Sequence, residues 1–246
     1  MTWPKYRLSN ARGYRLPADG RIVPGVTSLT AMTDPDAGGL VNWASNLAAE
    51  AAVDTREEWD PLDLRADALD LIKARARSRQ SLQREVGSAT HDLIERLTIE
   101  EVHGTGPIST DVPRALLPYV SAWWDWREEV KPTFMETEVT LIHRGIGYAG
   151  TADALAVVPQ VGKVLVDYKT GKSIRRKDHA QVTLLALAEA ILRDDGSEEG
   201  WLGVDALWLV QLRPGGVARA REPHLRVGDL QPRVPQVRAI RQRIRN

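Results

Sequence analysis

The sequence predicts an α/β fold in which helices flank a mixed central sheet. Helical periodicity dominates up to about residue 135, and the pattern then changes to β-branched and alternating segments separated by Gly- and Pro-containing turns. Strands are expected over 137–144, 148–158 and 163–169, and together they would form a three-stranded meander. Helices followed by a meander, a further helix and more strands are typical of a mixed sheet covered by helices.

The chain is expected to form a single domain over residues 1–246. Its 246 residues suffice for a full hydrophobic core, and no linker cleanly divides them. Within this domain the sequence distinguishes a mostly helical N-terminal part, a sheet and helix that carry the chemistry, and a basic C-terminal tail, over 1–135, 136–225 and 226–246.

Four helices are expected in the N-terminal part, after one short strand that precedes Val26. Leu40, Trp43 and Leu47 recur at the spacing of one helix face, which predicts a helix from about Leu40 to Val53. Similar patterns predict helices over 62–79, 86–101 and 112–130. The last of these is expected to end before Lys131-Pro132, because the residue that precedes a proline disfavours the helical conformation.

A helix and two strands are expected after the meander. Asp178 is a suitable N-cap residue, and it predicts a helix that runs to about Leu192. Strands are then expected over 204–212 and 217–221, joined by the turn residues Pro214-Gly-Gly216.

Composition excludes several classes of protein. The chain has no cysteine, which excludes disulfides, thiolate zinc sites and cysteine-held iron–sulfur clusters. It lacks a run of about 18 apolar residues, so no membrane span is expected. The segment Met1–Lys5 lacks the apolar stretch of a secretory signal. A cytoplasmic location is therefore expected.

The formal net charge is zero. This balance argues against a generally basic surface for nucleic acid, but it leaves room for a local basic channel. Positive charge gathers in three segments, 73–84, 172–177 and 238–245. Each segment is either a solvated face or a nucleic-acid contact.

Three residues on the meander could carry chemistry. Side chains alternate between the two faces of a strand, so Asp167 and Lys169 share a face, roughly 6.5–7 Å apart. Asp153 lies on the preceding strand. A turn centred near Val161 would set Lys169 opposite Asp153 and would make Asp167 the diagonal neighbour of Asp153, roughly 7–8 Å away. Two carboxylates at that separation can reach one cation between them.

Two carboxylates and an ammonium on one face favour a hard divalent cation such as Mg²⁺ or Mn²⁺. Such an ion polarises a phosphoryl oxygen and lowers the pKa of a bound water, while a lysine can orient that water or stabilise charge on the phosphate. For Asp167-Tyr-Lys169 alone, the alternative is a solvent-facing strand end with an ordinary acid–lysine pair.

An ordered set of short motifs accompanies these residues. Gly87-Ser-Ala-Thr-His91 opens an expected helix, Gly150-Thr-Ala-Asp153 and Asp167-Tyr-Lys169 follow on adjacent strands, and Gln181 comes in the first turn of the next helix. In this order the motifs resemble the RecB-like branch of the PD-(D/E)XK nuclease superfamily. The chain also looks similar to mitochondrial genome-maintenance exonucleases and to short exonucleases carried by phages of actinobacteria. The resemblance covers about residues 23–190.

The resemblance implies a restriction-endonuclease-like core with a site for Mg²⁺ or Mn²⁺. Asp153 and Asp167 would be metal ligands, joined by His91 and by the backbone carbonyl of Tyr168. The same resemblance implies no iron–sulfur cluster here, because the cysteines that hold one in some relatives are missing.

The resemblance also implies roles outside the metal ligands. Lys169 would be the catalytic lysine, and Gln181 would hydrogen-bond near the substrate phosphate or the lysine. The RecB-like pattern often has Tyr four residues after this glutamine, where this chain has Leu185, which leaves a DNA-contacting role for the motif open. Glu138 is a candidate for an additional acid near the site.

Three tryptophans in the helix expected over 112–130 have two interpretations. Trp123, Trp124 and Trp126 either stack unpaired bases or pack in the core. Trp123 and Trp126 share a helix face and are expected to be buried, which leaves Trp124 as the most exposed of the three.

The expected function is that of a Mg-dependent deoxyribonuclease, and within that class an exonuclease of DNA recombination, DNA repair or phage DNA metabolism. The alternatives are an endonuclease of the same fold and a catalytically silent nucleic-acid-binding module. The sequence contains no recognisable helix-turn-helix or zinc finger to read a target, which favours the exonuclease. The expected partners are DNA with a free end and a single-strand annealing protein or recombinase.

Overall fold

The computed structural model describes residues 13–32, 37–59, 65–103, 112–171, 173–215 and 219–221. The chain divides into two compact units, of which the first comprises Met1–Thr33 with Thr90–Asn246 and the second comprises Asp34–Ala89. The basic segments at 226–246 and at Lys172 lie outside the described residues. Among the described helices, none combines the length and the apolar character that a bilayer span requires.

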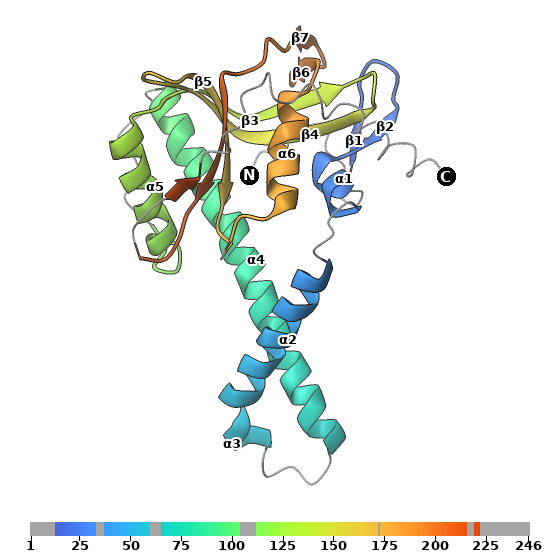
Figure 1. Cartoon of the computed structure of the whole chain (residues 1–246), viewed down its shortest axis with the longest axis vertical. Coiled ribbons are helices and arrows are strands. Elements are labelled where there is room, and N and C mark those ends of the chain that lie inside the picture. Colours follow the sequence, from blue (N-terminus) through green and yellow to red (C-terminus); the bar gives the residue numbers. More distant parts are fainter. Residues whose placement is uncertain are drawn as a thin grey trace. The chain divides into compact units, whose positions relative to one another are not determined.

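The first unit is built on a mixed sheet (Figure 1). Its strands are β3 (Thr133–His143), β4 (Tyr148–Val158), β5 (Gly162–Lys169), β6 (Ala190–Leu192), β7 (Glu198–Gly200), β8 (Ala206–Gln211) and β9 (Arg219–Arg221). They lie in the order β7-β6-β3-β4-β5-β8-β9, with β5 and β8 parallel and all other neighbours antiparallel. The expected α/β class with a mixed sheet is therefore confirmed.

Helices cover both faces of this sheet (Figure 1). On one face, α1 (Val26–Met32) and α6 (Arg176–Ala186) pack over a core that includes Leu155 and Leu165. On the other face, α5 (Leu117–Val130) packs through Trp126 against Tyr168 and Trp208. A separate two-stranded ribbon, β1 (Gly13–Arg15) with β2 (Ile22–Pro24), adds Tyr14, Leu16 and Val23 to a second core cluster.

The second unit is helical. It contains α2 (Ala37–Asp54), α3 (Arg56–Trp59) and the first part of α4 (Arg65–His103). Leu47, Ala51 and Thr55 are buried there. Ion pairs join α4 to the two shorter helices, because Arg79 contacts Glu50 and Asp54 while Arg75 contacts Glu58.

Helices α4 and α5 differ from their expected bounds, and no helix was predicted where α1 and α3 lie. The separate helices expected over 62–79 and 86–101 form one continuous α4, because the intervening Gln80–Glu85 contains no Gly or Pro and is rich in good helix formers. The helix expected from 112 begins only at Leu117, with Pro118 in its first turn, where a proline is tolerated because an N–H at that position would have no partner within the helix.

The helix expected from Asp178 to Leu192 was wrong at both ends. It begins at Arg176, so Asp178 is its third residue, and the Asp178 carboxylate accepts a hydrogen bond from the N–H of Arg175 at 2.7 Å. It ends at Ala186, after which Ala190–Leu192 forms β6 and pairs with β3. Tertiary pairing with an existing strand therefore overrides the helical preference of this alanine- and leucine-rich segment.

The β4–β5 hairpin also differs from the expected register. Pairing runs from Val158↔Gly162 to Ala154↔Val166, which places the centre of the turn at Gln160 instead of Val161. Gln160 has a φ of 66° and Gly162 a φ of 99°, so the turn closes within three residues and Gly162 already pairs as part of β5.

This register changes the neighbour of Asp153. Continuing the observed pairing by one step sets Asp153 opposite Asp167, whereas the sequence predicted that it would lie opposite Lys169. The pairing is displaced by two residues, and a displacement of two leaves every side chain on its predicted face. The two acids are therefore nearer to each other in the sheet than the sequence predicted.

Candidate active site

The residues that the sequence singled out meet around the open end of the β4–β5 hairpin. They come from four elements of the first unit, namely His91 on α4, Asp153 on β4, Asp167 and Lys169 on β5, and Gln181 on α6. The contacts that follow join all five into one cluster, although they are spread over more than ninety residues of sequence.

Asp153 lies where β4 and β5 stop pairing through their backbones. The ladder ends at Ala154↔Val166, and beyond it the N–H of Tyr168 donates to Asp153 Oδ2 at 2.5 Å. A carboxylate thus takes the place of a backbone acceptor, which fixes the position of Asp153 relative to the strand that carries Asp167 and Lys169.

Asp167, Lys169 and Gln181 form a closed set of contacts. Lys169 Nζ lies 2.5 Å from Asp167 Oδ2 and donates to Gln181 Oε1 at 3.5 Å. Gln181 Nε2 donates to Asp167 Oδ1 at 3.0 Å. Gln181 is in the second turn of α6, not the first as expected. Its amide reaches both charged residues from there and holds the acid and the ammonium in one arrangement.

His91 closes the cluster on the α4 side. Its Nδ1 lies 3.4 Å from Asp153 Oδ2. Its ring also meets the ring of Tyr168 edge-on, with the centroids 6.4 Å apart. The imidazole remains partly accessible, since 31% of its side chain is exposed.

The two carboxylates have opposite pKa shifts. Burial, reinforced by the charge of Asp153 and only partly offset by Lys169, raises the pKa of Asp167 to about 6. Burial also disfavours ionisation of Asp153, but the charge and hydrogen bond of His91, together with Lys169, outweigh burial and lower the pKa of Asp153. The Asp167 side chain is only 2% exposed, so its charge is the costlier of the two.

The two basic residues of the cluster respond to these acids. Burial disfavours the imidazolium of His91, but the neighbouring Asp153 outweighs burial and raises the pKa of the histidine. Lys169 behaves in the same way, because Asp167 and Asp153 overcome its burial and raise its pKa. In this cluster the neighbouring charges favour the ionised forms of Asp153, His91 and Lys169. Asp167 differs, because its burial and the charge of Asp153 favour its protonated form.

Aromatic residues support the cluster from behind. The hydroxyl of Tyr168 accepts a hydrogen bond from Trp123 Nε1 at 3.1 Å, and Trp126 packs edge-on against the same tyrosine. Trp123 and Trp126 are buried, as the sequence predicted, and are therefore not available to stack bases. Trp124 is partly exposed and lies against Trp123, with the guanidinium of Arg127 5.2 Å from its ring centroid.

Other contacts fix the elements that carry the site. Gly150, in the Gly-x-x-Asp motif, leaves room for the close approach of α1 and α6, because a Cβ there would lie 2.5 Å from Val26 and 2.8 Å from Leu185. At the end of β8, Gln211 Nε2 donates to the carbonyl of Gly171, and the N–H of Leu212, the next residue, donates to the carbonyl of Lys169, both at 2.8 Å. No local sequence pattern predicts these supports, since they depend on tertiary packing.

Glu138, the additional acid suggested by the sequence, lies beside the cluster on β3. In the β3–β4 register it falls between Thr137↔Ala154 and Val139↔Ala152, next to Asp153. It has a φ of 49°, an uncommon conformation for a non-glycine residue in a strand. Glu138 therefore lies near the cluster, as the sequence suggested, and its side chain lines a neighbouring cavity.

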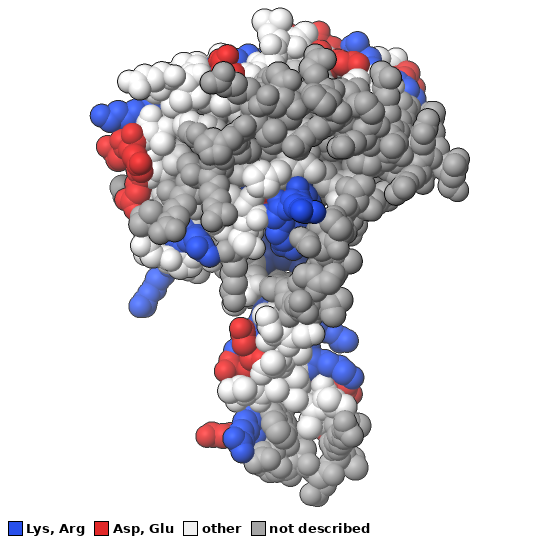
Figure 2. All heavy atoms as spheres, viewed as in Figure 1, with Lys and Arg blue, Asp and Glu red and all other residues white. Residues whose placement is uncertain are grey.

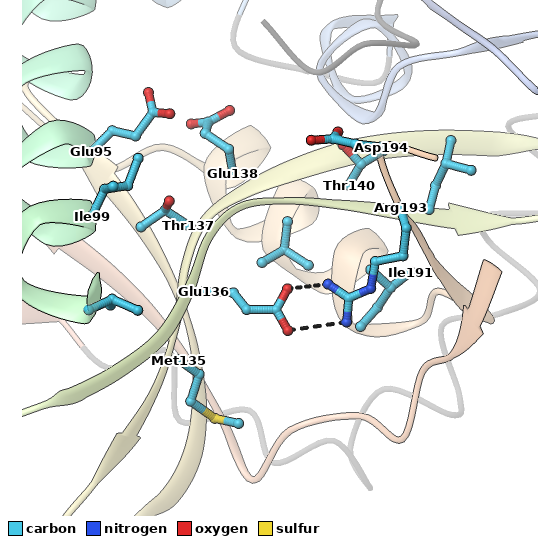
Figure 3. Close-up of a pocket in the computed structure, with 13 residues that line it drawn as sticks. Glu95, Ile99, Met135, Glu136, Thr137, Glu138, Thr140, Ile191, Arg193 and Asp194 are labelled. Atoms are coloured by element: carbon cyan, nitrogen blue, oxygen red, sulfur yellow. Dashed lines mark hydrogen bonds and ion pairs between the residues drawn. The ribbon is translucent and has the colours of Figure 1, made fainter. Parts of the chain in front are cut away.

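That cavity has a volume of about 360 Å³ and lies between α4, β3 and β6 (Figure 3). Its wall includes Glu95 and Glu138, and Arg193 donates to both carboxylate oxygens of Glu136 across one side. None of the five cluster residues lines this cavity. The cavity is therefore adjacent to the candidate site and is not part of it.

The donor set of the cluster fits a hard divalent cation. Two carboxylates and an imidazole are present, and among the described residues the buried Oδ2 of Asp167 has no hydrogen-bond partner besides its ion contact with Lys169. Within the described ranges, no group of three or more His, Asp or Glu side chains forms a preformed metal cage. Mg²⁺ does not need one, because it usually binds through one or two carboxylates and keeps several waters.

No protein-family model and no curated protein matches this chain. The residues of the cluster themselves indicate its chemistry. An acid pair, a fixed lysine and a side-chain amide can together hold a cation and bind an anionic substrate such as a phosphodiester.

Proposed function

We propose that this chain is a Mg²⁺- or Mn²⁺-dependent nuclease that hydrolyses phosphodiester bonds in DNA, and that the cluster is its active site. The observation that carries the proposal is the set of contacts joining Asp153, Asp167, Lys169 and Gln181. These are the residues at which the ordered motifs resemble the RecB-like branch of the PD-(D/E)XK nucleases.

Asp153 and Asp167 would hold the cation, with His91 and the backbone carbonyl of Tyr168 completing the protein ligands. When bound, the ion supplies Lewis-acid polarisation of the phosphoryl oxygen and a lowered pKa for a bound water. Its positive charge would also offset the burial and the neighbouring Asp153 that raise the pKa of Asp167 to about 6.

The remaining residues would act on the substrate and on one another. Lys169 carries a stable positive charge, because Asp167 and Asp153 raise its pKa, and its ammonium can donate to the phosphate as negative charge develops there. Gln181 positions Lys169 through its carbonyl oxygen and Asp167 through its amide nitrogen. Tyr168 acts through its backbone N–H, which holds Asp153.

We further propose that the enzyme is an exonuclease that starts at a free DNA end. The described residues contain no appended module that would read a base sequence, and an enzyme that cuts internally at chosen sites needs such contacts. A role in DNA recombination, repair or phage DNA metabolism, with a single-strand annealing protein or recombinase as partner, fits an end-processing enzyme.

The test is incubation of the full chain with end-labelled linear DNA and with covalently closed circles of the same sequence. We expect short products from linear DNA in Mg²⁺ or Mn²⁺, none in EDTA, and intact circles. Equal cleavage of circles and linear DNA would establish the endonuclease alternative. DNA binding without cleavage in either metal would instead favour a silent binding module, and undiminished cleavage in EDTA would exclude the proposed mechanism.

A further inference from the structure

The segment between two residues of the cluster carries a group of basic side chains. Lys169 ends β5, Gln181 lies on α6, and Arg175, Arg176 and Lys177 come between them, where α6 begins. The two ends of this segment are tied together, because Lys169 Nζ donates to Gln181 Oε1. The basic side chains are therefore held close to the cluster by the fold.

The loop that leads to these residues is anchored as well. Its Gly171 carbonyl accepts a hydrogen bond from Gln211 Nε2 at 2.8 Å, and Gln211 is buried. At the start of α6, the N–H of Arg175 donates to the carboxylate of Asp178. Both bonds restrict the backbone that carries the three basic side chains, so the residues that bear them stay near Lys169.

These charges differ from others that the sequence drew attention to. Arg75 and Arg79, in the basic segment before His91, are paired with acids of α2 and α3. By contrast, Arg175, Arg176 and Lys177 form no ion pair with another described residue; the two arginines are exposed and Lys177 is half-buried. Figure 2 shows Lys and Arg side chains gathered over the start of α6.

Lys177 has the closest relation to the cluster. It precedes Gln181 by four residues on α6, and residues at that spacing lie on one helix face with their Cβ atoms about 5–6 Å apart. Gln181 contacts Asp167 and Lys169 from this face. Lys177 therefore lies one helical turn from Gln181 on the same face of α6, and Arg176 immediately precedes it.

We propose that Arg175, Arg176 and Lys177 form a strand-binding surface for the phosphodiester backbone of DNA, with Lys177 on the phosphate next to the one that is cleaved. The identity of the ligand rests on the proposed nuclease function. A group of cations beside a phosphodiester-cleaving site matches a ligand that carries one negative charge per nucleotide. Contacts of this kind position a strand without reading its sequence.

The surface is tested by the salt dependence of DNA binding. The full chain is titrated into a fluorescent single-stranded oligonucleotide of mixed sequence, in Ca²⁺ to limit cleavage, over a range of salt concentrations, and anisotropy gives Kd. The variants are Lys177→Gln, Arg176→Gln and the double substitution. Each single variant should weaken binding several-fold and lower the slope of log K against log salt by about 0.7, the value for one lost contact to a single strand.

Two controls separate this surface from a general effect of charge or folding. Lys177→Arg keeps the charge and should retain most of the affinity and slope. Lys163→Gln removes one charge from the opposite end of β5, about 20 Å from Lys169 along the strand, and should bind DNA as the wild type does. Thermal unfolding of each variant establishes that the fold is retained.

The outcomes distinguish the surface from the nuclease activity. If the wild type binds DNA, the variants bind it more weakly and no cleavage occurs in Mg²⁺, the strand-binding surface is supported and the proposed nuclease function is refuted. Cleavage in Mg²⁺, with Lys177→Gln and Arg176→Gln binding at wild-type affinity and slope, would overturn the surface alone and indicate that these side chains are merely solvated. Absence of DNA binding by the wild type would overturn both.

Discussion

Lys169 Nζ lies 2.5 Å from Asp167 Oδ2, while the other oxygen of the same carboxylate accepts a hydrogen bond from Gln181. Even with an ammonium this close, burial and the charge of Asp153 raise the pKa of Asp167 to about 6. The ammonium of Lys169 therefore does not by itself offset the burial of Asp167 and the charge of Asp153. A divalent cation at the Asp167 carboxylate would reduce this cost.

Gln181 should matter for rate more than for stability. Gln181→Leu removes both side-chain hydrogen bonds that hold Lys169 and Asp167, and loss of such an outer partner typically costs about 10–100-fold in metal affinity or activity. We expect a fall of that size in the single-turnover rate of DNA cleavage. Gln160→Asn, in the hairpin turn, is the control and should cleave normally. A wild-type rate for Gln181→Leu would show that this contact is not used.

Binding of Mn²⁺ or Mg²⁺ should strengthen as the pH rises. The cation must displace protons from its ligands. Burial raises the pKa of Asp167 to about 6, and Asp153 outweighs burial to raise the pKa of His91. Adding Mn²⁺ to the full chain should therefore raise Tm more at about pH 8 than at about pH 5.5.

The same measurement has a matched pair of variants. Asp153→Asn removes a proposed ligand and should abolish the Mn²⁺-dependent rise in Tm, whereas Asp125→Asn, at an exposed position on α5, should retain it. An equal rise in Tm for both variants would place the ion elsewhere in the protein.

Asp167 should also make stability depend on pH without any added metal. Because the pKa of Asp167 is raised to about 6 by burial, the folded chain binds this proton more tightly than the unfolded chain does. The resulting stabilisation is complete below about pH 4 and is lost as the pH rises through about 6.

Asp167→Asn cannot ionise and should not lose stability in this way. In EDTA, the unfolding free energy of the variant relative to wild type should shift in favour of the variant by about 1–3 kcal/mol between about pH 4.5 and about pH 7.5. Urea unfolding at the two pH values measures this difference. A constant difference across that range, or a shift in the opposite direction, would contradict the raised pKa.

The hydroxyl of Tyr168 should contribute to stability and little to chemistry. It accepts the hydrogen bond from buried Trp123, so Tyr168→Phe leaves the indole N–H without an acceptor, at a cost of about 1–3 kcal/mol. The backbone N–H that holds Asp153 is unchanged by this substitution. Urea unfolding should therefore show lower stability for Tyr168→Phe, while the cleavage rate should stay close to that of the wild type. A large loss of rate with unchanged stability would instead assign the hydroxyl to the reaction.

The sequence predicts the fold most reliably where local pattern and tertiary structure agree. The apolar run Val164-Leu-Val166, with two β-branched residues, marks β5, and the bounds expected for β4 are those observed. The strand β6 was missed because Ala190–Leu192 has no strand-like pattern, and it is a strand only because β3 offers it a partner. The hairpin register was wrong because one residue in the turn decides it.

Part of the candidate site could be predicted from local pattern and part could not. Strand alternation and motif order predict that Asp153, Asp167 and Lys169 lie together, and these residues do lie in one cluster. The hydrogen bond from Trp123 to Tyr168 links residues far apart in sequence, so no local pattern predicts it. The pairing of Arg79 with Glu50 and Asp54 likewise depends on how α2 packs against α4.

Asp167 and Lys169 are proposed to perform metal-dependent cleavage of DNA. The most direct test of this proposal is the single-turnover rate on end-labelled linear DNA in Mg²⁺ for wild type, Asp167→Asn and Lys169→Met, with Asp125→Asn as the control and folding checked by circular dichroism. We predict cleavage by the wild type and by the control, and a loss of at least about 100-fold in each active-site variant. Wild-type cleavage by Asp167→Asn or Lys169→Met, in preparations free of contaminating nuclease, would contradict the account.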